Sequence, residues 1–299
     1  MTTIFKQIAL VLLFLSSCLL PACQKKLPNS QRDACSSTCK YLVIGHTYED
    51  AGLVDRRIED ADLTQYDQIW LGGDICSETT RDTATLDYLD DLFDLSSNRT
   101  HWAVGNHDVR NGHTERITKH THRPLFYTQS FDGLTIIVLN TNYYEPDDCT
   151  KMEEQANLIR SVCDTISQSS HLIVFMHHIV WGNVESGMNV SAYANVNSSW
   201  LAFSCPPVQR FETIVYPELL RVQQQGIPVI CISGDFGQEA ATYEWTTADG
   251  ITFLGTGITS EIEWNEQWPT AGQRDSVLVI ERDLVQKTLS WQFIDLEDI

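Results

Sequence analysis

Five short stretches of the sequence concentrate side-chain types that bind metal ions. They are GHTYED at 45–50, GGDICSE at 72–78, GNHD at 105–108, MHHIVW at 176–181 and GDFGQE at 234–239. A carboxylate can bridge two cations, while imidazoles and an amide oxygen fill the remaining coordination positions. Two ions held about 3.5–4 Å apart can clamp a phosphoryl group and activate water for in-line attack. The residue types therefore predict a metal site suited to phosphate ester hydrolysis.

Each stretch follows an apolar run that predicts a buried strand. These strands cover 40–45, 66–73, 101–105, 171–176 and 227–234, and a further strand covers 134–140. In layered α/β folds, ligand sites collect beyond the carboxyl ends of strands. In four stretches a glycine would let the chain turn sharply and aim the next side chain at a common point. These glycines are Gly45, Gly73, Gly105 and Gly234.

The rest of the chain predicts one α/β domain over residues 40–299. Helical apolar spacing covers 82–95, 150–168 and 216–225, between the predicted strands. The tail instead holds three consecutive strands, at 251–257, 276–283 and 288–295. This order favours a layered α/β sandwich in which two sheets pack together. We find no internal repeat and no linker that would divide these residues.

A long stretch at 179–214 has little periodicity and contains Trp181 and Trp200. A loop of this length in a compact domain is often functional, so it could roof the site. It could equally be an insertion packed on the surface. Trp181 could stack on a base or sugar ring of a substrate, or it could belong to the core.

Residues 1–23 have the pattern of an export signal, with Lys6 before an apolar run that is too short to span a membrane. Two segments resemble a bacterial lipobox, LSSC ending at Cys18 and LPAC ending at Cys23. Cys23 is the preferred lipidation site, because the polar residues 24–39 after it resemble a tether. We expect an exported protein that is lipid-anchored in the bacterial cell envelope, with ordinary secretion as the alternative.

The chain carries a formal net charge of −20, which disfavours nucleic-acid polymers and anionic membrane surfaces as partners. Membrane contact is expected only through the lipid anchor. An anionic substrate would need a local positive centre, which bound metal could supply. Seven of the nine cysteines follow Cys23, and export would permit disulfides whose pairing the sequence leaves open. No pair of CxxC units indicates a cysteine zinc site. The sequence does not indicate an oligomeric state.

The ordered series GHTY, GGD, GNHD, MHH and GDFG resembles the five motif blocks of the calcineurin-like metallophosphoesterase superfamily. The resemblance covers most of residues 40–299, and GNHD is its most specific block. The fourth block, within LIVFMHHIVWGN, is similar to the corresponding stretch of purple acid phosphatases. The segment DGITFLGTGI at 249–258 also resembles the stretch located after the last metal block in this superfamily.

The resemblance implies a four-layer α-β-β-α sandwich of two packed mixed sheets, and it also implies roles by position. Asp74 would be the bridging carboxylate, and Asn106 and His177 would be ligands of the second metal. His107 would contact the phosphate or act as general acid, held by Asp108. His178 could touch the substrate, although a position behind the metal ligands or facing solvent is the better reading of that residue.

Two blocks depart from the superfamily pattern. His46 stands where an Asp is usual and Tyr48 where a His is usual, while Asp235 and Gly237 replace the two histidines of the last block. The net charge of the ligands is kept, because a His and an Asp have exchanged places. The second metal position then has the donors Asp74, Asn106, His177 and Asp235. The first has Asp74 and His46, with Tyr48, Glu49, Asp50 or Gln238 as possible helpers, and we expect it to be weak, altered or empty.

These observations favour an exported, metal-dependent phosphoesterase that hydrolyses a phosphate mono- or diester through metal-activated water. Its substrate would be a phosphorylated small molecule or a phosphodiester. Its cofactors would be one or two ions of Mn, Fe or Zn, which suit mixed nitrogen and oxygen donors. The alternative is a catalytically weakened ligand-binding or interaction lipoprotein on the same fold.

Overall fold

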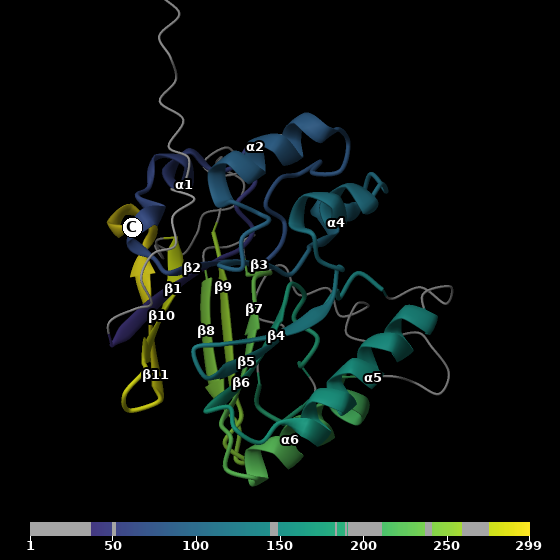
Figure 1. Ribbon diagram of the computed structural model, residues 1–299, viewed down its shortest axis with the longest axis vertical. Coiled ribbons are helices and arrows are strands. Elements are labelled where there is room, and N and C mark those ends of the chain that lie inside the picture. The colour runs from purple at the N-terminus through teal and green to yellow at the C-terminus, as the bar shows by residue number, and fades with distance from the viewer. Residues whose placement is uncertain are drawn as a thin grey trace, which may run out of the picture.

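A large, curled mixed sheet with helices packed against it forms the framework of the protein (Figure 1). The computed structural model describes residues 37–49, 52–143, 149–182, 184–188, 190, 211–236, 241–258 and 275–299. In these residues the sheet has 11 strands, with β3-β2-β1-β10-β9-β7-β6-β5-β4 along its main path. Two further strands lie off this path, since β11 pairs with β10 and β8 pairs with β9. The chain is therefore an α/β protein.

The sheet has two halves that meet through the pairing of β9 with β10. The first half comprises β1 (Thr38–Ile44), β2 (Gln68–Leu71), β3 (Thr100–Trp102), β10 (Ser276–Asp283) and β11 (Thr288–Asp295). The second comprises β4 (Tyr127–Phe131), β5 (Leu134–Val138), β6 (His171–Met176), β7 (Val229–Ser233), β8 (Ala241–Thr246) and β9 (Thr252–Gly257). Strands β9 and β10 are antiparallel and pair through one residue of each, Gly257 and Ser276.

Parallel pairing brings the ends of several strands to the same edge. Strands β1, β2 and β3 are parallel neighbours, and so are β5, β6, β7 and β9. Strands β2, β5, β6, β7 and β9 are buried along their whole length. Parallel strands covered on both faces have continuous apolar sequences, which explains why these runs were predictable.

Helices lie around the sheet and pack against it (Figure 1). They are α1 (Arg56–Asp60), α2 (Thr83–Phe93), α3 (Asn106–Val109), α4 (Glu115–Thr121), α5 (Cys149–Thr165) and α6 (Tyr216–Gln224). Buried α2 residues such as Leu89 pack with β1 and β2 residues such as Leu42. Ile159 of α5 and Leu219 of α6 pack with residues of β6 and β7. A third cluster joins residues of both halves, including Trp70 of β2 and Phe175 of β6.

The structure confirms the predicted strands and helices, with boundaries displaced by a few residues. The prediction did not include α1, α3, α4, β4 or β8. It was wrong about the end of the tether, because Thr38 and Cys39 already belong to β1. Residues 1–36, which contain the predicted export signal, Cys23 and most of the tether, lie outside the described residues. Within the described part of the chain, no helix is long and apolar enough to cross a membrane.

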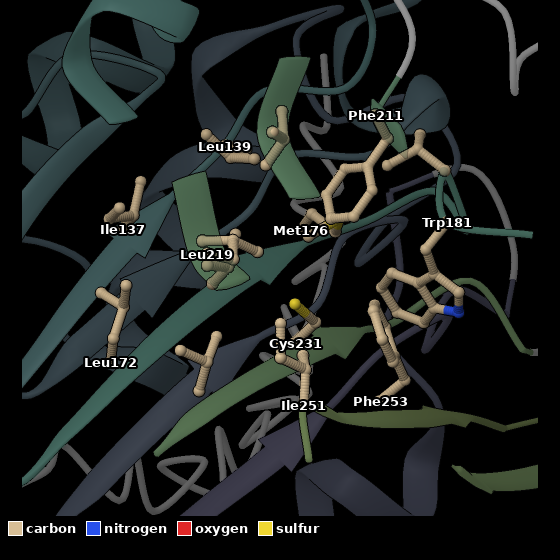
Figure 2. Packing of buried hydrophobic residues seen from close by; sticks show 14 of the residues in the cluster. Ile137, Leu139, Leu172, Met176, Trp181, Phe211, Leu219, Cys231, Ile251 and Phe253 are labelled. Atoms are coloured by element: carbon tan, nitrogen blue, oxygen red, sulfur yellow. The ribbon is translucent and has the colours of Figure 1, made fainter. Parts of the chain in front are cut away.

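The segment at 179–214 is partly structured where it is described. A π-helical turn, Phe211–Val215, leads directly into α6. Trp181 is fully buried in the core, with its ring centroid 5.1 Å from that of Phe253 (Figure 2). The possible substrate contact through Trp181 is therefore wrong, because the indole has no exposed face. Trp200 lies outside the described residues.

The cysteines divide into bonded and free residues. Cys39 and Cys149 are disulfide-bonded. Cys76, Cys163 and Cys231 are buried free thiols. Burial raises the pKa of Cys163 to about 12, so this thiol stays protonated at neutral pH.

His101 is a buried histidine in the interior of the fold, on β3. Its ring stacks on Phe131 and meets Trp70 edge to face, and its Nδ1 lies 3.1 Å from the Tyr127 hydroxyl. Burial, followed by the nearby Arg123 charge, lowers the pKa of His101 from 6.5 to about 3. The unfolded chain therefore takes up a proton at His101 before the folded chain does.

We predict that His101 contributes to acid instability. Above pH 6.5 the neutral ring does not lower the free energy of unfolding. As the pH falls, the free energy of unfolding decreases because of His101, by about 2 kcal/mol at pH 5. Chemical denaturation with a chelator present, at pH 7.5 and at pH 5, measures this decrease, and for His101→Phe it should be about 2 kcal/mol smaller than for the wild type. Identical losses in the wild type and the variant would contradict the assignment.

Candidate metal centre

The loops that follow β1 and β2 continue the pairing of these strands beyond their ends. The backbone N–H of His46 donates to the Gly73 carbonyl at 2.9 Å, and that of Thr47 donates to the Asp74 carbonyl at 3.0 Å. These two bonds hold the first and second motif blocks side by side. His46 and Asp74 thereby enter the same buried space, and each is at most 4% exposed.

The glycines at the strand ends are needed for close backbone approach more than for turning. Among the four predicted turning glycines, only Gly73 has a positive φ, of 90°. A Cβ on Gly45 would overlap the backbone of Gly234, and a Cβ on Gly234 would overlap the backbone of Gly72. A Cβ on Gly105 would overlap the Asp74 carboxylate. The predicted reason for these three glycines is therefore wrong, although their importance at the site stands.

Two candidate ligands have strained backbones. His46 and Asp74 occupy the left-handed region, with φ of 56° and 54°. Such conformations cost about 1–3 kcal/mol each and persist only where the surrounding structure enforces them. Here the paired loops and the buried surroundings do so. Strain at two adjacent polar residues is typical of functional sites.

Two groups of buried side chains could each hold a metal ion. One group contains His46, Asp74 and Asp235, and the other contains His177, His178 and Asp235. Within each group, one potential ligand atom from each residue lies within 4.8 Å of those of the other two. Asp235 belongs to both groups, so the first position has three donors instead of the two that were expected.

The His177 ring is oriented as a metal ligand would be. Its Nδ1–H donates to the Gly72 carbonyl at 2.8 Å, which directs Nε2 toward the carboxylates. Nε2 lies 3.4 Å from Asp74 Oδ2 and 3.5 Å from Asp235 Oδ1. This nitrogen is buried and, among the described residues, has no partner within ordinary hydrogen-bond geometry besides these two ion pairs. A backbone carbonyl behind the ring and a buried Nε2 that faces carboxylates are typical of a metal-binding histidine, so the donor set fits a metal ion.

The electrostatics of the centre favour a cation. Burial lowers the pKa of His177, but the carboxylates of Asp74 and Asp235 outweigh it and raise the value to about 10. Burial disfavours the Asp74 anion, and His177 more than compensates, so the pKa of Asp74 falls below its ordinary range. Burial and the Asp74 charge raise the pKa of Asp235 to about 8. A metal ion would therefore displace protons from this centre on binding.

His46 is suited to coordination as a neutral ring. Its Nδ1–H donates to the Ile258 carbonyl at 3.3 Å, leaving Nε2 as the available donor. Burial is the main reason that the pKa of His46 falls to about 4, so the imidazole is neutral at pH 7. Ile258 ends the segment 249–258, whose sequence resembles the stretch after the last metal block of the superfamily.

Asn106 and His178 form a connected pair at the edge of the second group. His178 Nε2 lies 3.1 Å from Asn106 Oδ1, and His178 Nδ1 lies 2.8 Å from the Thr141 hydroxyl. In this arrangement His178 orients the Asn106 carboxamide, which agrees with a position behind the ligands. In the opposite tautomer of His178, Nδ1–H would donate to Thr141. Nε2 could then bind a metal ion together with His177 and Asp235.

Asp108 holds the loops of the centre together. Its carboxylate accepts hydrogen bonds from five donors, and burial followed by the Asp74 charge raises its pKa to about 6. At neutral pH it is therefore mainly ionised. The donors are the backbone N–H groups of Asp74, Ile75 and Gly105, the Thr79 hydroxyl and the Trp102 indole.

Arg110 and Tyr48 contact the His107 ring. Arg110 donates to His107 Nδ1 at 3.1 Å, which places the ring proton on Nε2. Both Asp108 oxygens accept hydrogen bonds from the loops, and the expectation that Asp108 holds the His107 ring stays a prediction. Tyr48 stacks on the same ring, with centroids 4.6 Å apart and planes at 16°. The His107 backbone N–H donates to Asp74 Oδ1 at 2.8 Å.

The structure describes only some of the residues that were predicted as possible further ligands of the first metal position. Tyr48 lies beside the centre, with its ring centroid 4.8 Å from that of His46. Asp50 and Gln238 lie outside the described residues. Thr141 and Arg110 were not predicted as site residues, although they contact His178 and His107. Thr141 had a usable signal, because it follows the buried strand β5 as other site residues follow theirs.

No protein-family model matches this sequence, and no curated protein matches it either. The resemblance to metallophosphoesterases therefore depends on the order of the five motif blocks. The candidate site depends on the geometry of the buried histidines and carboxylates.

We predict that Asp108→Asn will destabilise the protein by about 4 kcal/mol, because an amide cannot accept from all five donors. Metal affinity should fall as well, since the loop that carries Asp74 loses its anchor. Denaturant titration and metal titration would measure the two effects. Asp87→Asn is the matched control, since the Asp87 side chain is 70% exposed and its pairing with His120 should contribute under about 1 kcal/mol. Equal stabilities for the two variants would contradict this role.

Proposed function

We propose that the protein is a metal-dependent phosphoesterase of the calcineurin-like metallophosphoesterase type. The observation that carries this proposal is the pair of buried donor groups that share Asp235. They lie at the carboxyl ends of strands, and they contain residues from four of the five motif blocks in the expected order. GNHD supplies the remaining block through Asn106 and His107.

The proposed fold is a four-layer α-β-β-α sandwich. The three core clusters support it. One lies between α5 and α6 and the second half of the sheet, and another lies between α2 and the first half. The third joins side chains from both halves, as expected between two facing sheets.

In this proposal the chain would hold up to two ions of Mn, Fe or Zn. His46 would serve one position and His177 the other, with Asp74 and Asp235 available to both. Asn106 would complete the second position, or His178 would do so in its other tautomer. Bound ions would attract phosphate oxygens and lower the pKa of a bound water toward neutrality.

His107 and its neighbours would act on the substrate itself. With Arg110 donating to Nδ1, His107 carries its ring proton on Nε2, and this N–H would donate to a phosphate oxygen or a leaving group. Stacking on Tyr48 would keep the ring in this orientation. Arg110 also adds local positive charge, although the chain as a whole is strongly acidic. These features would let an anionic ester approach.

The same proposal includes export and attachment to the cell envelope. It is supported by the sequence of residues 1–23, where Cys23 follows LPA and precedes a polar stretch. The substrate would then be a phosphorylated small molecule or a phosphodiester outside the cytoplasm.

Turnover tests the proposed function. Protein loaded with Mn²⁺, Zn²⁺ or iron should hydrolyse p-nitrophenyl phosphate or bis(p-nitrophenyl) phosphate, and chelation should remove the activity. Asp74→Ala and Asn106→Ala should each lower kcat/KM by about 100-fold or more, because each removes a group from the reacting centre. The control Asp87→Ala should retain wild-type rates.

A different result would favour the alternative function. If the protein binds metal but hydrolyses neither ester with any of these ions, the enzyme proposal fails. A ligand-binding lipoprotein would then be the better description. Unchanged rates in Asp74→Ala would likewise exclude this centre as the source of any activity.

A further inference from the structure

We propose that Asp235 is a second bridging carboxylate, with one oxygen for the ion at His46 and the other for the ion at His177. The resemblance implies one bridging residue, Asp74, and a histidine at the position of Asp235. This inference rests on the proposed function only in requiring that the centre binds metal ions.

The placement of Asp235 between the two histidines is the main evidence. Asp235 is 4% exposed and is the residue that the two donor groups have in common. Its Oδ1 lies 3.5 Å from His177 Nε2, close to the 3.4 Å between that nitrogen and Asp74 Oδ2. The two carboxylates thus approach His177 in nearly the same way. Both also belong to the donor group that contains His46.

The backbone holds Asp235 in this position. The preceding residue, Gly234, packs against Gly45 and Gly72 so closely that none of the three has room for a Cβ. The Asp235 N–H donates to the Ser233 hydroxyl at 3.4 Å, and that hydroxyl donates to the His177 carbonyl. Asp235 is therefore fixed relative to the first, second and fourth motif blocks.

The chemistry of the exchanged residues explains why a bridge is needed. An imidazole offers one lone pair through Nε2, whereas a carboxylate offers two oxygens. The first position has a neutral His46 where a carboxylate is usual, so it lacks an anionic ligand of its own. A bridging Asp235 would restore that charge. Two carboxylates with neutral histidines would leave two divalent ions with a net positive charge, which suits an anionic ester.

Metal stoichiometry tests the bridge without using activity. Equilibrium dialysis with Mn²⁺ should give two ions per wild-type chain, and electron paramagnetic resonance should show exchange coupling between them. Asp235→Asn should raise the Kd of both ions by at least about 10-fold, because both lose the same anionic ligand. Asp235→His should keep one ion near wild-type affinity and lose the other together with the coupling. Asp87→Asn should behave as wild type, and circular dichroism should show that every variant is folded.

Each other outcome overturns the bridge. Loss of only one ion in Asp235→Asn would make Asp235 a ligand of a single metal and leave the metal centre itself intact. Retention of two coupled ions in Asp235→His would show that the pair of ions does not need the Asp235 carboxylate. If Asp235→Asn did not fold, the result for Asp235→His alone would decide whether Asp235 bridges the ions. A wild type that binds a single ion would also exclude the bridge, and one that binds none would exclude the proposed function as well.

Discussion

Close packing of three glycine backbones is the constraint on which the rest of the centre depends. Gly45, Gly72 and Gly234 end strands from the two halves of the sheet, and none of them has room for a side chain. Because glycines have no side chains, their backbones can touch, and this brings loops from distant parts of the sequence within a few ångströms of one another. Those loops carry the candidate ligands His46, Asp74 and Asp235. A single added methyl group at this crossing would force the loops, and with them the ligands, apart.

Burial of acidic side chains at this crossing has an energetic cost that the fold offsets in two ways. Asp108 is satisfied by donors from the surrounding loops and serves as an internal anchor. Asp74 and Asp235 instead face His177, which carries the compensating positive charge when no metal is bound. A buried carboxylate with several donors is structural, whereas buried acidic side chains gathered around one imidazolium are ready to exchange their protons for a cation. The centre thus separates an aspartate that holds the loops from aspartates that could hold metal.

Much of the framework was predictable from the sequence because its parallel strands are buried along their length and appear as continuous apolar runs. Strand β4 was missed because its residues alternate between half-buried and exposed positions, which weakens the apolar signal. The convergence of the candidate ligands was also predictable, since parallel strands end at a common edge. The partners of the His107 ring were not predictable, and neither was the membership of Asp235 in both donor groups. The contact between Arg110 and the His107 ring depends on the position at which the short helix α3 begins, because both residues lie in or next to that helix. Residue types alone do not determine this position.

Anomalous X-ray scattering from crystals grown with Mn²⁺ or Zn²⁺, recorded at the absorption edge of the metal, would show whether the buried donors hold two ions. Two peaks are expected in the buried space at the strand ends. One should adjoin His46, the other should adjoin His177, and both should lie next to Asp74 and Asp235. Well-ordered crystals without a peak at these residues, or with metal bound only elsewhere on the chain, would contradict the proposed metal centre.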